Sequence, residues 1–163
     1  MAAFREIRRK DRIWDNESAR ELLEKSEYGI LSVCAPEGYG YGIPLNYILE
    51  GDSLYFHCAP EGHKLDAVRT NDRVSFCVVG NTQVIPGKFT TNYASVIVFG
   101  HMTIVENDEE RLHALRLLVG KYSADFREVS ERYIAGSFGR TAILRLDIEH
   151  LSGKTKKATP QPM

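Results

Sequence analysis

The sequence predicts one domain of mainly β-structure, in which six short antiparallel strands form a closed or nearly closed barrel and helices lie between the strands. Two observations lead to this fold class. Short runs rich in β-branched and aromatic residues recur along the chain, separated by turn residues. Strict alternation of strand and helix is absent, so a doubly wound parallel sheet is the weaker interpretation. A chain of 163 residues can bury such a core without disulfide or metal staples.

The first part of the chain is expected to form a helix followed by three strands. Asp15 or Asn16 can cap a helix over residues 17–26, because their side-chain oxygens accept from free amides of the first turn. Turn residues then divide three β-rich runs, and the short divider at 50–53 makes the last two a hairpin. We expect these strands over residues 28–34, 41–49 and 53–58.

The second part of the chain alternates between strands and helices. Gly100 interrupts the longest predicted strand with a bulge or bend. Asn107 or Asp108 can cap the clearest helix. Acidic residues in its first turn and Lys121 at its end complement its dipole. A single domain then covers residues 1–152, and the tail, 153–163, is expected to be loosely ordered. We expect helices over 63–70, 108–121 and 126–134, strands over 74–79, 93–105 and 141–148, and a polar loop over 80–92.

Charge and composition exclude several classes of protein. The chain has 21 Lys and Arg against 22 Asp and Glu, so its net charge of −1 gives no global attraction to nucleic acid or an anionic membrane. The basic cluster at 5–12 is interrupted by acids and lacks aromatic residues, which favours a solvated arm, or one that packs on a partner subunit, over a nucleic-acid contact. The longest apolar runs, 29–35 and 94–100, are too short to cross a bilayer. Three cysteines without close pairing favour a reducing cytoplasm.

The most informative stretch is Pro-Glu-Gly-His-Lys at 60–64, where a strand ends and a helix begins. His63 and Lys64 in a first helical turn oppose the helix dipole and are poorly placed for stability. They are well placed if an anion docks there, because amide donors, the dipole and the Lys64 ammonium would together hold a phosphate. The alternative is that both side chains are solvated on a surface turn. The spacing of a P-loop is absent.

The segment 41–47, Tyr-Gly-Ile-Pro-Leu-Asn-Tyr, is unusual for a central strand. Pro44 cannot donate to a ladder, so its backbone must face a sheet edge or a ligand. Gly40 and Gly42 would let a flat group approach the backbone closely. On these residues alone, an irregular edge strand is favoured over a binding strand.

Metal and nucleophile chemistry find little support in the sequence. His57, Cys58 and His63 are close together, but no second Cys/His pair completes a tetrahedral zinc site, so no metal is predicted. Cys34, Cys58 and Cys77 all occur in apolar, strand-like runs, where cysteine usually acts as a small hydrophobic residue. The Gly-x-Ser-x-Gly elbow of serine hydrolases is absent.

Several segments follow one another in a characteristic order: Ile7-Arg-Arg-Lys-Asp-Arg12, Glu27-Tyr-Gly-Ile-Leu-Ser32, Gly42-Ile-Pro-Leu-Asn-Tyr47, Leu54-Tyr-Phe-His-Cys-Ala59, Gly62-His-Lys64, Tyr93-Ala-Ser-Val-Ile-Val-Phe-Gly100 and Leu151-Ser-Gly-Lys154. In this order they resemble the FMN-binding split-barrel superfamily that includes pyridoxamine 5′-phosphate oxidase. Within it, the nearest resemblance is to the nitroimidazole-resistance-type branch. The resemblance covers roughly residues 5–155. Its specificity lies in the ordered set, because no single motif is decisive.

The resemblance implies a six-stranded antiparallel split barrel with peripheral helices. It also implies a homodimer that holds FMN at the subunit interface, with a small-molecule substrate and no nucleic-acid or membrane partner. The family's phosphate contacts fall on His63 and Lys64, which helix-terminus chemistry singles out independently, and the preceding Gly62 is also expected to contact the cofactor. Its other flavin contacts fall on Ile43, Pro44, Leu45, Asn46, His57, Cys58, Ala59 and Ser95.

The sequence departs from the oxidase at positions that matter for its activity. His63 stands where the oxidase carries a phosphate-binding arginine, which implies a weaker and more pH-sensitive grip. Ser95 stands where it carries a glutamine. The oxidase's C-terminal tryptophan and arginine, which recognise the vitamin phosphate, are not found, and Trp14 is the only tryptophan. Oxidation of vitamin B6 is therefore not expected.

What the resemblance implies instead is a cytoplasmic, flavin-dependent reductase of a small molecule such as a nitroaromatic compound. His63 would be its catalytic residue, donating a proton or stabilising negative charge on the nitro oxygens. Holding the phosphate is the alternative role for His63. Two other functions stay open: a non-catalytic flavin-binding or storage module, and a haem-binding barrel with an axial histidine.

Overall fold

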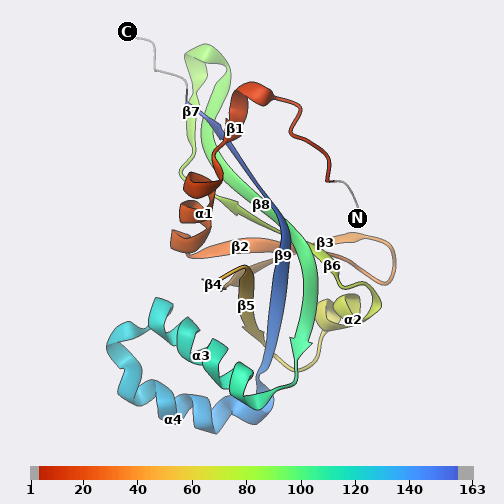
Figure 1. Ribbon diagram of the computed structural model, residues 1–163, viewed down its shortest axis with the longest axis vertical. Coiled ribbons are helices and arrows are strands. Elements are labelled where there is room, and N and C mark those ends of the chain that lie inside the picture. Colours follow the sequence, from red (N-terminus) through yellow and green to blue (C-terminus); the bar gives the residue numbers. More distant parts are fainter. Residues whose placement is uncertain (1–3, 158–163) are drawn as a thin grey trace.

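The computed structural model describes residues 4–157, whose strands form one curled antiparallel sheet (Figure 1). The sheet order is β3-β2-β6-β8-β9-β5-β4, with β1 paired to β9 and β7 paired to β8. Antiparallel pairing throughout these ladders excludes the parallel alternative and confirms the split-barrel fold. The strands are β1 (Ile13–Trp14), β2 (Tyr28–Cys34), β3 (Gly40–Asn46), β4 (Ile48–Glu50), β5 (Ser53–Cys58), β6 (Arg73–Val79), β7 (Gln83–Ile85), β8 (Thr90–Val105) and β9 (Ala142–Lys156).

The main core fills the inside of the curled sheet. Residues of β2 and β6 alternate between buried and exposed, the period expected of strands with one face toward a core. Tyr47, Phe56 and Phe76 form its centre, with ring centroids of Tyr47 and Phe76 4.7 Å apart and those of Phe56 and Phe76 5.2 Å apart. All three side chains are fully buried, so the interior of the barrel is filled by protein.

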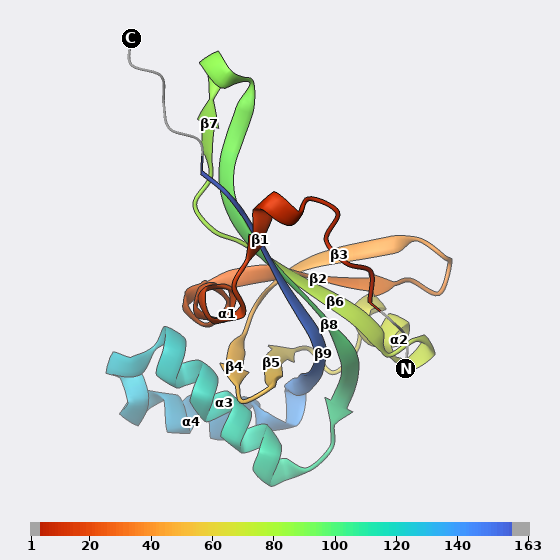
Figure 2. The same ribbon diagram turned by 45° about the horizontal axis from the view of Figure 1, so that its top comes forward.

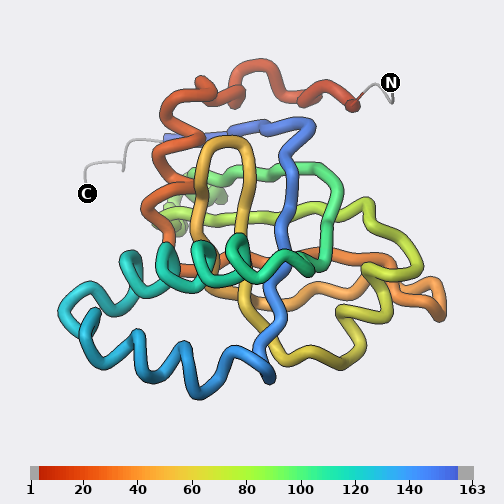
Figure 3. Tube along the Cα trace, turned by 60° about the horizontal axis from the view of Figure 1, so that its bottom comes forward, coloured from red at the N-terminus to blue at the C-terminus, as the bar shows by residue number. Residues whose placement is uncertain are grey.

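The helices surround the sheet, and two of them begin at the predicted caps. The Asp15 carboxylate accepts from the Ser18 amide at 2.8 Å, and the Asn107 side-chain oxygen accepts from the Glu110 amide at 2.9 Å. Figure 3 shows two of the helices side by side across one end of the sheet, over a second, smaller core. The helices are α1 (Asn16–Lys25), α2 (His63–Thr70), α3 (Asp108–Tyr122) and α4 (Arg127–Ser137), with 3₁₀ turns η1 (Lys10–Arg12), η2 (Pro86–Lys88), η3 (Ala124–Phe126) and η4 (Phe138–Arg140).

The predicted strand 41–49 is in fact two strands, so the main sheet path has seven strands rather than six. Tyr47 separates them. Its amide donates to the Tyr122 hydroxyl at 3.0 Å, and that hydroxyl lies 2.7 Å from the Tyr47 carbonyl oxygen. A side chain of α3 therefore replaces the strand ladder at this point, which the local sequence could not reveal.

Two boundaries also differ from the prediction. Part of the predicted loop 80–92 is a hairpin, because β7 pairs with the start of β8, and Figure 2 shows this hairpin projecting from the body of the fold. The last strand continues to Lys156, so the first residues of the predicted tail 153–163 are paired rather than loose. Residues 158–163 of that tail lie outside the described residues.

The predicted bulge at Gly100 is confirmed. The register between β8 and β9 shifts between Phe99 and Gly100. A Cβ atom at Gly100 would lie 2.0 Å from the carbonyl oxygen of Asp147, closer than any real contact. Only glycine therefore fits where the two longest strands bend.

Candidate functional site

Three segments that carry most of the predicted contacts lie together at one end of the curled sheet. Strand β3 contacts β5, and α2 begins shortly after β5 ends. The rings of Tyr41 in β3 and His63 in α2 are 4.9 Å apart in an edge-to-face arrangement. The fold therefore brings residues 43–46, 57–59 and 62–64 into one region, although they come from separate elements.

Strand β3 supplies a sheet edge to this region. It is the terminal strand of the main path and pairs with β2, so its second edge carries backbone groups outside that ladder. Ile43 and Leu45 are half-buried and pack on the main core, whereas Pro44 and Asn46 are exposed. The Asn46 side-chain amide donates to the Glu27 carbonyl oxygen at 2.9 Å, which fixes the end of the strand.

The end of β5 supplies an imidazole and a thiol that are both neutral near pH 7. Desolvation by the surrounding protein lowers the pKa of His57 below its usual value of 6.5. Burial raises the pKa of the Cys58 thiol, and the positive charge of Lys64 opposes that rise. Because its charge acts on the pKa of Cys58, the Lys64 ammonium lies within electrostatic reach of that thiol. Cys58 is therefore a thiol rather than a thiolate nucleophile.

The start of α2 is built as the sequence predicts. Gly62 has φ 130°, which favours glycine, and its carbonyl oxygen accepts from the amides of Leu65 and Asp66 at 2.9 and 3.2 Å. Gly62 offers no side chain to cap the first-turn amides, which have no intrahelical acceptors. His63 is exposed, with Nε2 3.7 Å from Glu37 Oε2. Lys64 is half-buried beside it.

A cleft of about 800 Å³ opens next to these segments. Four of the predicted contacts, Asn46, His57, Cys58 and Ala59, form one side of it. Helices α3 and α4 with their connecting residues form the other. The remaining predicted contacts, from residues 43–45 and 62–64 together with Ser95, are not part of the cleft lining.

Sequence reasoning missed the opposite wall of the cleft. Phe126, Val129 and Tyr133 line it and remain largely exposed. Their spacing of three and four residues places them on one helical face, and this was the signal available in the sequence. Without a view of the barrel, that face could be taken only for a packing surface.

Ser95 is the predicted contact that lies far along the sheet from the end of β5. In the sheet, Val105 and His57 both pair with Ile143, whereas Ser95 pairs with Lys154. Ser95 lies ten residues from Val105 along β8, which corresponds to roughly 30 Å of extended strand. Ser95 is nearer to β3, because it lies two residues from Ile97, which paired positions in β6 and β2 connect to Pro44.

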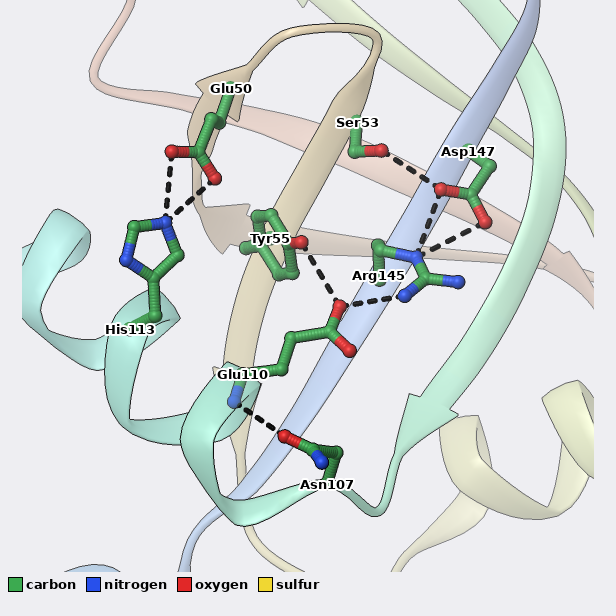
Figure 4. A network of polar contacts seen from close by, with 8 residues as sticks. All are labelled: Glu50, Ser53, Tyr55, Asn107, Glu110, His113, Arg145 and Asp147. Carbon is green, nitrogen blue, oxygen red and sulfur yellow. Dashed lines mark hydrogen bonds and ion pairs between the residues drawn. The ribbon is translucent and has the colours of Figure 1, made fainter.

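A polar network holds α3, and with it one wall of the cleft, against the sheet (Figure 4). The Tyr55 hydroxyl and Arg145 both donate to Glu110 Oε1, at 3.0 and 2.6 Å. Arg145 also donates to Asp147, at 2.9 Å. Burial, followed by the hydrogen bond to Glu110 and then by the Glu110 charge, raises the pKa of Tyr55 to about 12, so its hydroxyl stays a donor over the physiological range.

Neither a metal cluster nor a membrane helix is found among residues 4–157. Within that range, no three His, Cys, Asp or Glu side chains gather closely enough to hold a metal ion. None of the helices there combines the length and the apolar character needed to cross a bilayer.

We expect Glu110→Gln to weaken the attachment of α3. The substitution keeps the size of the side chain but removes the negative charge that pairs with Arg145. Both side chains are partly exposed, so solvent screens part of the interaction. The free energy of unfolding in urea should fall by about 1–2 kcal/mol. Glu109→Gln is the matched control, because Glu109 lies in the same helical turn and is exposed. Equal losses in the two variants would show that the network does not anchor the helix.

Comparison with known proteins agrees with the geometry of the fold. A sequence profile described as pyridoxamine 5′-phosphate oxidase matches residues 15–155. A search of curated proteins finds no match.

Similar solved structures include three bacterial proteins. A proposed 5-nitroimidazole antibiotic resistance protein from Bacteroides thetaiotaomicron is 21% identical, with a TM-score of 0.72 over 88% of this chain and 86% of that chain. An FAD-binding protein from Mesorhizobium loti is 24% identical, with a TM-score of 0.66 over 90% and 98%. An FAD- and haem-binding protein from Mycobacterium smegmatis is 18% identical, with a TM-score of 0.69 over 91% and 75%.

At such identities the structural likeness establishes the fold, and the profile establishes the family. The profile covers most of the chain, including β3, β5, α2 and the cleft between the sheet and α3. The resemblance seen in the sequence is confirmed: the chain belongs to the pyridoxamine 5′-phosphate oxidase family.

Proposed function

We propose that the protein binds FMN beside β3, β5 and the start of α2 and uses it to reduce a small molecule, with nitroaromatic compounds as the first class to test. The observation that carries this proposal is that three features lie together in one region of this chain, which belongs to the family. They are the free edge of β3, the neutral side chains at the end of β5, and the cationic first turn of α2. Flavin-binding proteins among the structural neighbours support it.

The residues present fit a phosphorylated flavin. The open first turn of α2 offers backbone amides and the Lys64 ammonium to a phosphate, without a side-chain cap in competition. Pro44 and Asn46 are exposed at the edge of β3, where a flat ring can approach. His57 to Ala59 continue that surface into the cleft. These segments would hold the phosphate and one edge of the ring.

The bound flavin would accept and pass on electrons, and the protein would supply orientation and a proton. His63 is placed for the second task, since it is exposed between Tyr41 and Glu37, whose carboxylate can orient the imidazole. Cys58 is unsuited to covalent catalysis because its thiol is protonated. In this proposal, His63 donates a proton to the reduced substrate.

A second copy of the chain would complete the site. The distance of Ser95 from the end of β5 is explained if it touches the flavin of a partner subunit. An exposed apolar stripe suits such a contact: Ile30, Cys77 and Ile97 occupy paired positions across β2, β6 and β8. The stripe continues through the pairing of Ile30 with Pro44, a proposed flavin contact. A two-fold dimer would therefore cover the stripe and bring the two flavin surfaces together.

Three free cysteines, Cys34, Cys58 and Cys77, suit the cytoplasm as the place of this activity.

Haem binding is the second candidate function. It is favoured by His57, whose lowered pKa leaves a neutral imidazole on the wall of the 800 Å³ cleft, as an axial ligand requires. A structural neighbour that binds both FAD and haem makes this candidate worth testing in parallel.

We expect Lys64→Ala to weaken FMN but not riboflavin, because only FMN carries the phosphate. Loss of one charge-assisted contact should raise the Kd for FMN about 10- to 100-fold, measured by quenching of flavin fluorescence. Lys88→Ala, on the exposed η2 turn, is the control and should leave both affinities unchanged. An equal loss for riboflavin would place Lys64 away from the phosphate.

We expect His63→Ala to lower the turnover of a nitroaromatic substrate about 100-fold, the contribution typical of a general acid. The affinity for FMN should change much less. His113→Ala is the control, since His113 pairs with Glu50 outside the site. Unchanged turnover would exclude His63 as the proton donor, and a parallel loss of FMN affinity would assign it to the phosphate.

We expect Ile97→Glu to abolish the dimer, because two carboxylates would have to be buried in the stripe. Light scattering should give a native mass near 18.4 kDa for this variant and twice that value for the unchanged protein. FMN affinity should fall together with the dimer. Val84→Glu, at an exposed apolar position on the projecting hairpin, serves as the control. A monomeric variant that keeps full FMN affinity would refute the shared site.

A further inference from the structure

The outer wall of the cleft has an apolar surface that the fold itself does not use. Phe126, Val129 and Tyr133 are 65%, 63% and 72% exposed, yet they share one face of the segment that ends in α4. A helix of a globular protein ordinarily turns its apolar face toward the core. In α4, Ile134 fulfils that role and is buried in the second core. The three exposed residues instead face the open space of the cleft.

The size and setting of the cleft suit a small molecule. Its volume of about 800 Å³ lies within the range of ligand pockets, roughly 300–1,000 Å³. Its floor contains His57, Cys58 and Ala59, the residues proposed to border the flavin ring. A molecule bound against Phe126 and Tyr133 would therefore lie between the aromatic wall and the proposed cofactor.

The charged groups of the cleft indicate one further property of its ligand. Glu27 and Arg140 are the charged side chains that line it among the described residues. Arg140 is exposed, and its guanidinium makes no hydrogen bond or ion pair within residues 4–157. By contrast, Arg111 and Arg145 bind acceptors on the same side of the molecule. A planar guanidinium without a partner is suited to a carboxylate, which it can bind with two parallel hydrogen bonds.

We propose that the cleft is the substrate pocket and that it takes a flat aromatic molecule bearing a carboxylate. The ring packs against Phe126 and Tyr133, and the carboxylate pairs with Arg140. Aromatic side chains favour offset or edge-on contact with another ring, and a guanidinium can hold a carboxylate with two parallel hydrogen bonds. The proposal rests on the proposed function for the role of the cleft in reduction, whereas the binding itself needs only the residues of the cleft.

The test uses two probes that differ in charge but little in shape, 2-naphthoate and 2-naphthalenemethanol. Binding to the full-length protein, with and without FMN, is measured by equilibrium dialysis. We expect naphthoate to bind about tenfold more tightly than the alcohol, the effect of one charge-assisted pair. Arg140→Gln should abolish that preference and leave the affinity for the alcohol unchanged.

Phe126→Ala should weaken both probes several-fold, because it removes ring contact from either one. Its matched control is Phe89→Ala, since Phe89 is 97% exposed on the projecting hairpin, away from the cleft. Equal affinity for the two probes, a preference that survives Arg140→Gln, or equal losses in the two phenylalanine variants would each overturn the proposal. Haemin that displaces naphthoate and gives a Soret band would also overturn it, because the cleft would then be a cofactor site.

Failure of the pocket and failure of the proposed function can be told apart. FMN binding is followed separately through flavin fluorescence in the same protein samples. If FMN does not bind but naphthoate binds with dependence on Arg140, the pocket stands and the proposed flavin function falls. If FMN binds with dependence on Lys64 but the two probes bind alike, the pocket assignment falls alone.

Discussion

The ladder between β8 and β9 is the constraint on which the rest of the structure depends. It runs from the pair Tyr93 and Lys156 to the pair Val105 and Ile143, so it connects the region of the projecting hairpin to the end of the sheet beside α3. The bulge at Gly100 bends both strands together and allows the sheet to curl around the aromatic core. Because β5 pairs with β9, the same ladder fixes His57 at one end and leaves Ser95 at the other. The proposed need for a second copy follows from this length.

The ladder also determines where the cleft lies, because the cleft forms where the sheet ends and α3 and α4 begin. Helix α3 is held at one end by Glu110, which accepts from Arg145 (Figure 4). At the other end it is held by Tyr122, whose hydroxyl accepts from the Tyr47 amide. These two attachments keep a helical wall beside β5 and leave space between them. The main core excludes ligands because Tyr47, Phe56 and Phe76 fill it. Chemistry is therefore possible at the surface of the barrel rather than inside it.

The sequence was informative where local physical rules act, and less so where distant segments meet. Caps at Asp15 and Asn107, the bulge at Gly100 and the turn at Gly62 were all predictable, because each depends on a few neighbouring residues. The break of the predicted strand at Tyr47 was not, since its cause is a tyrosine 75 positions away. The wall formed by α4 was missed for the same reason. Resemblance to a family supplied the flavin contacts, which no local rule would have grouped together.

The central claim is that this surface holds FMN, between one protomer's β3, β5 and α2 and its partner. The measurement that tests it most directly is the visible absorption spectrum of the freshly purified protein, with any released chromophore identified by its mass. The account predicts the two-band spectrum of a flavin and release of FMN. A Soret spectrum with bound iron, or a colourless protein that takes up no added FMN, would contradict it.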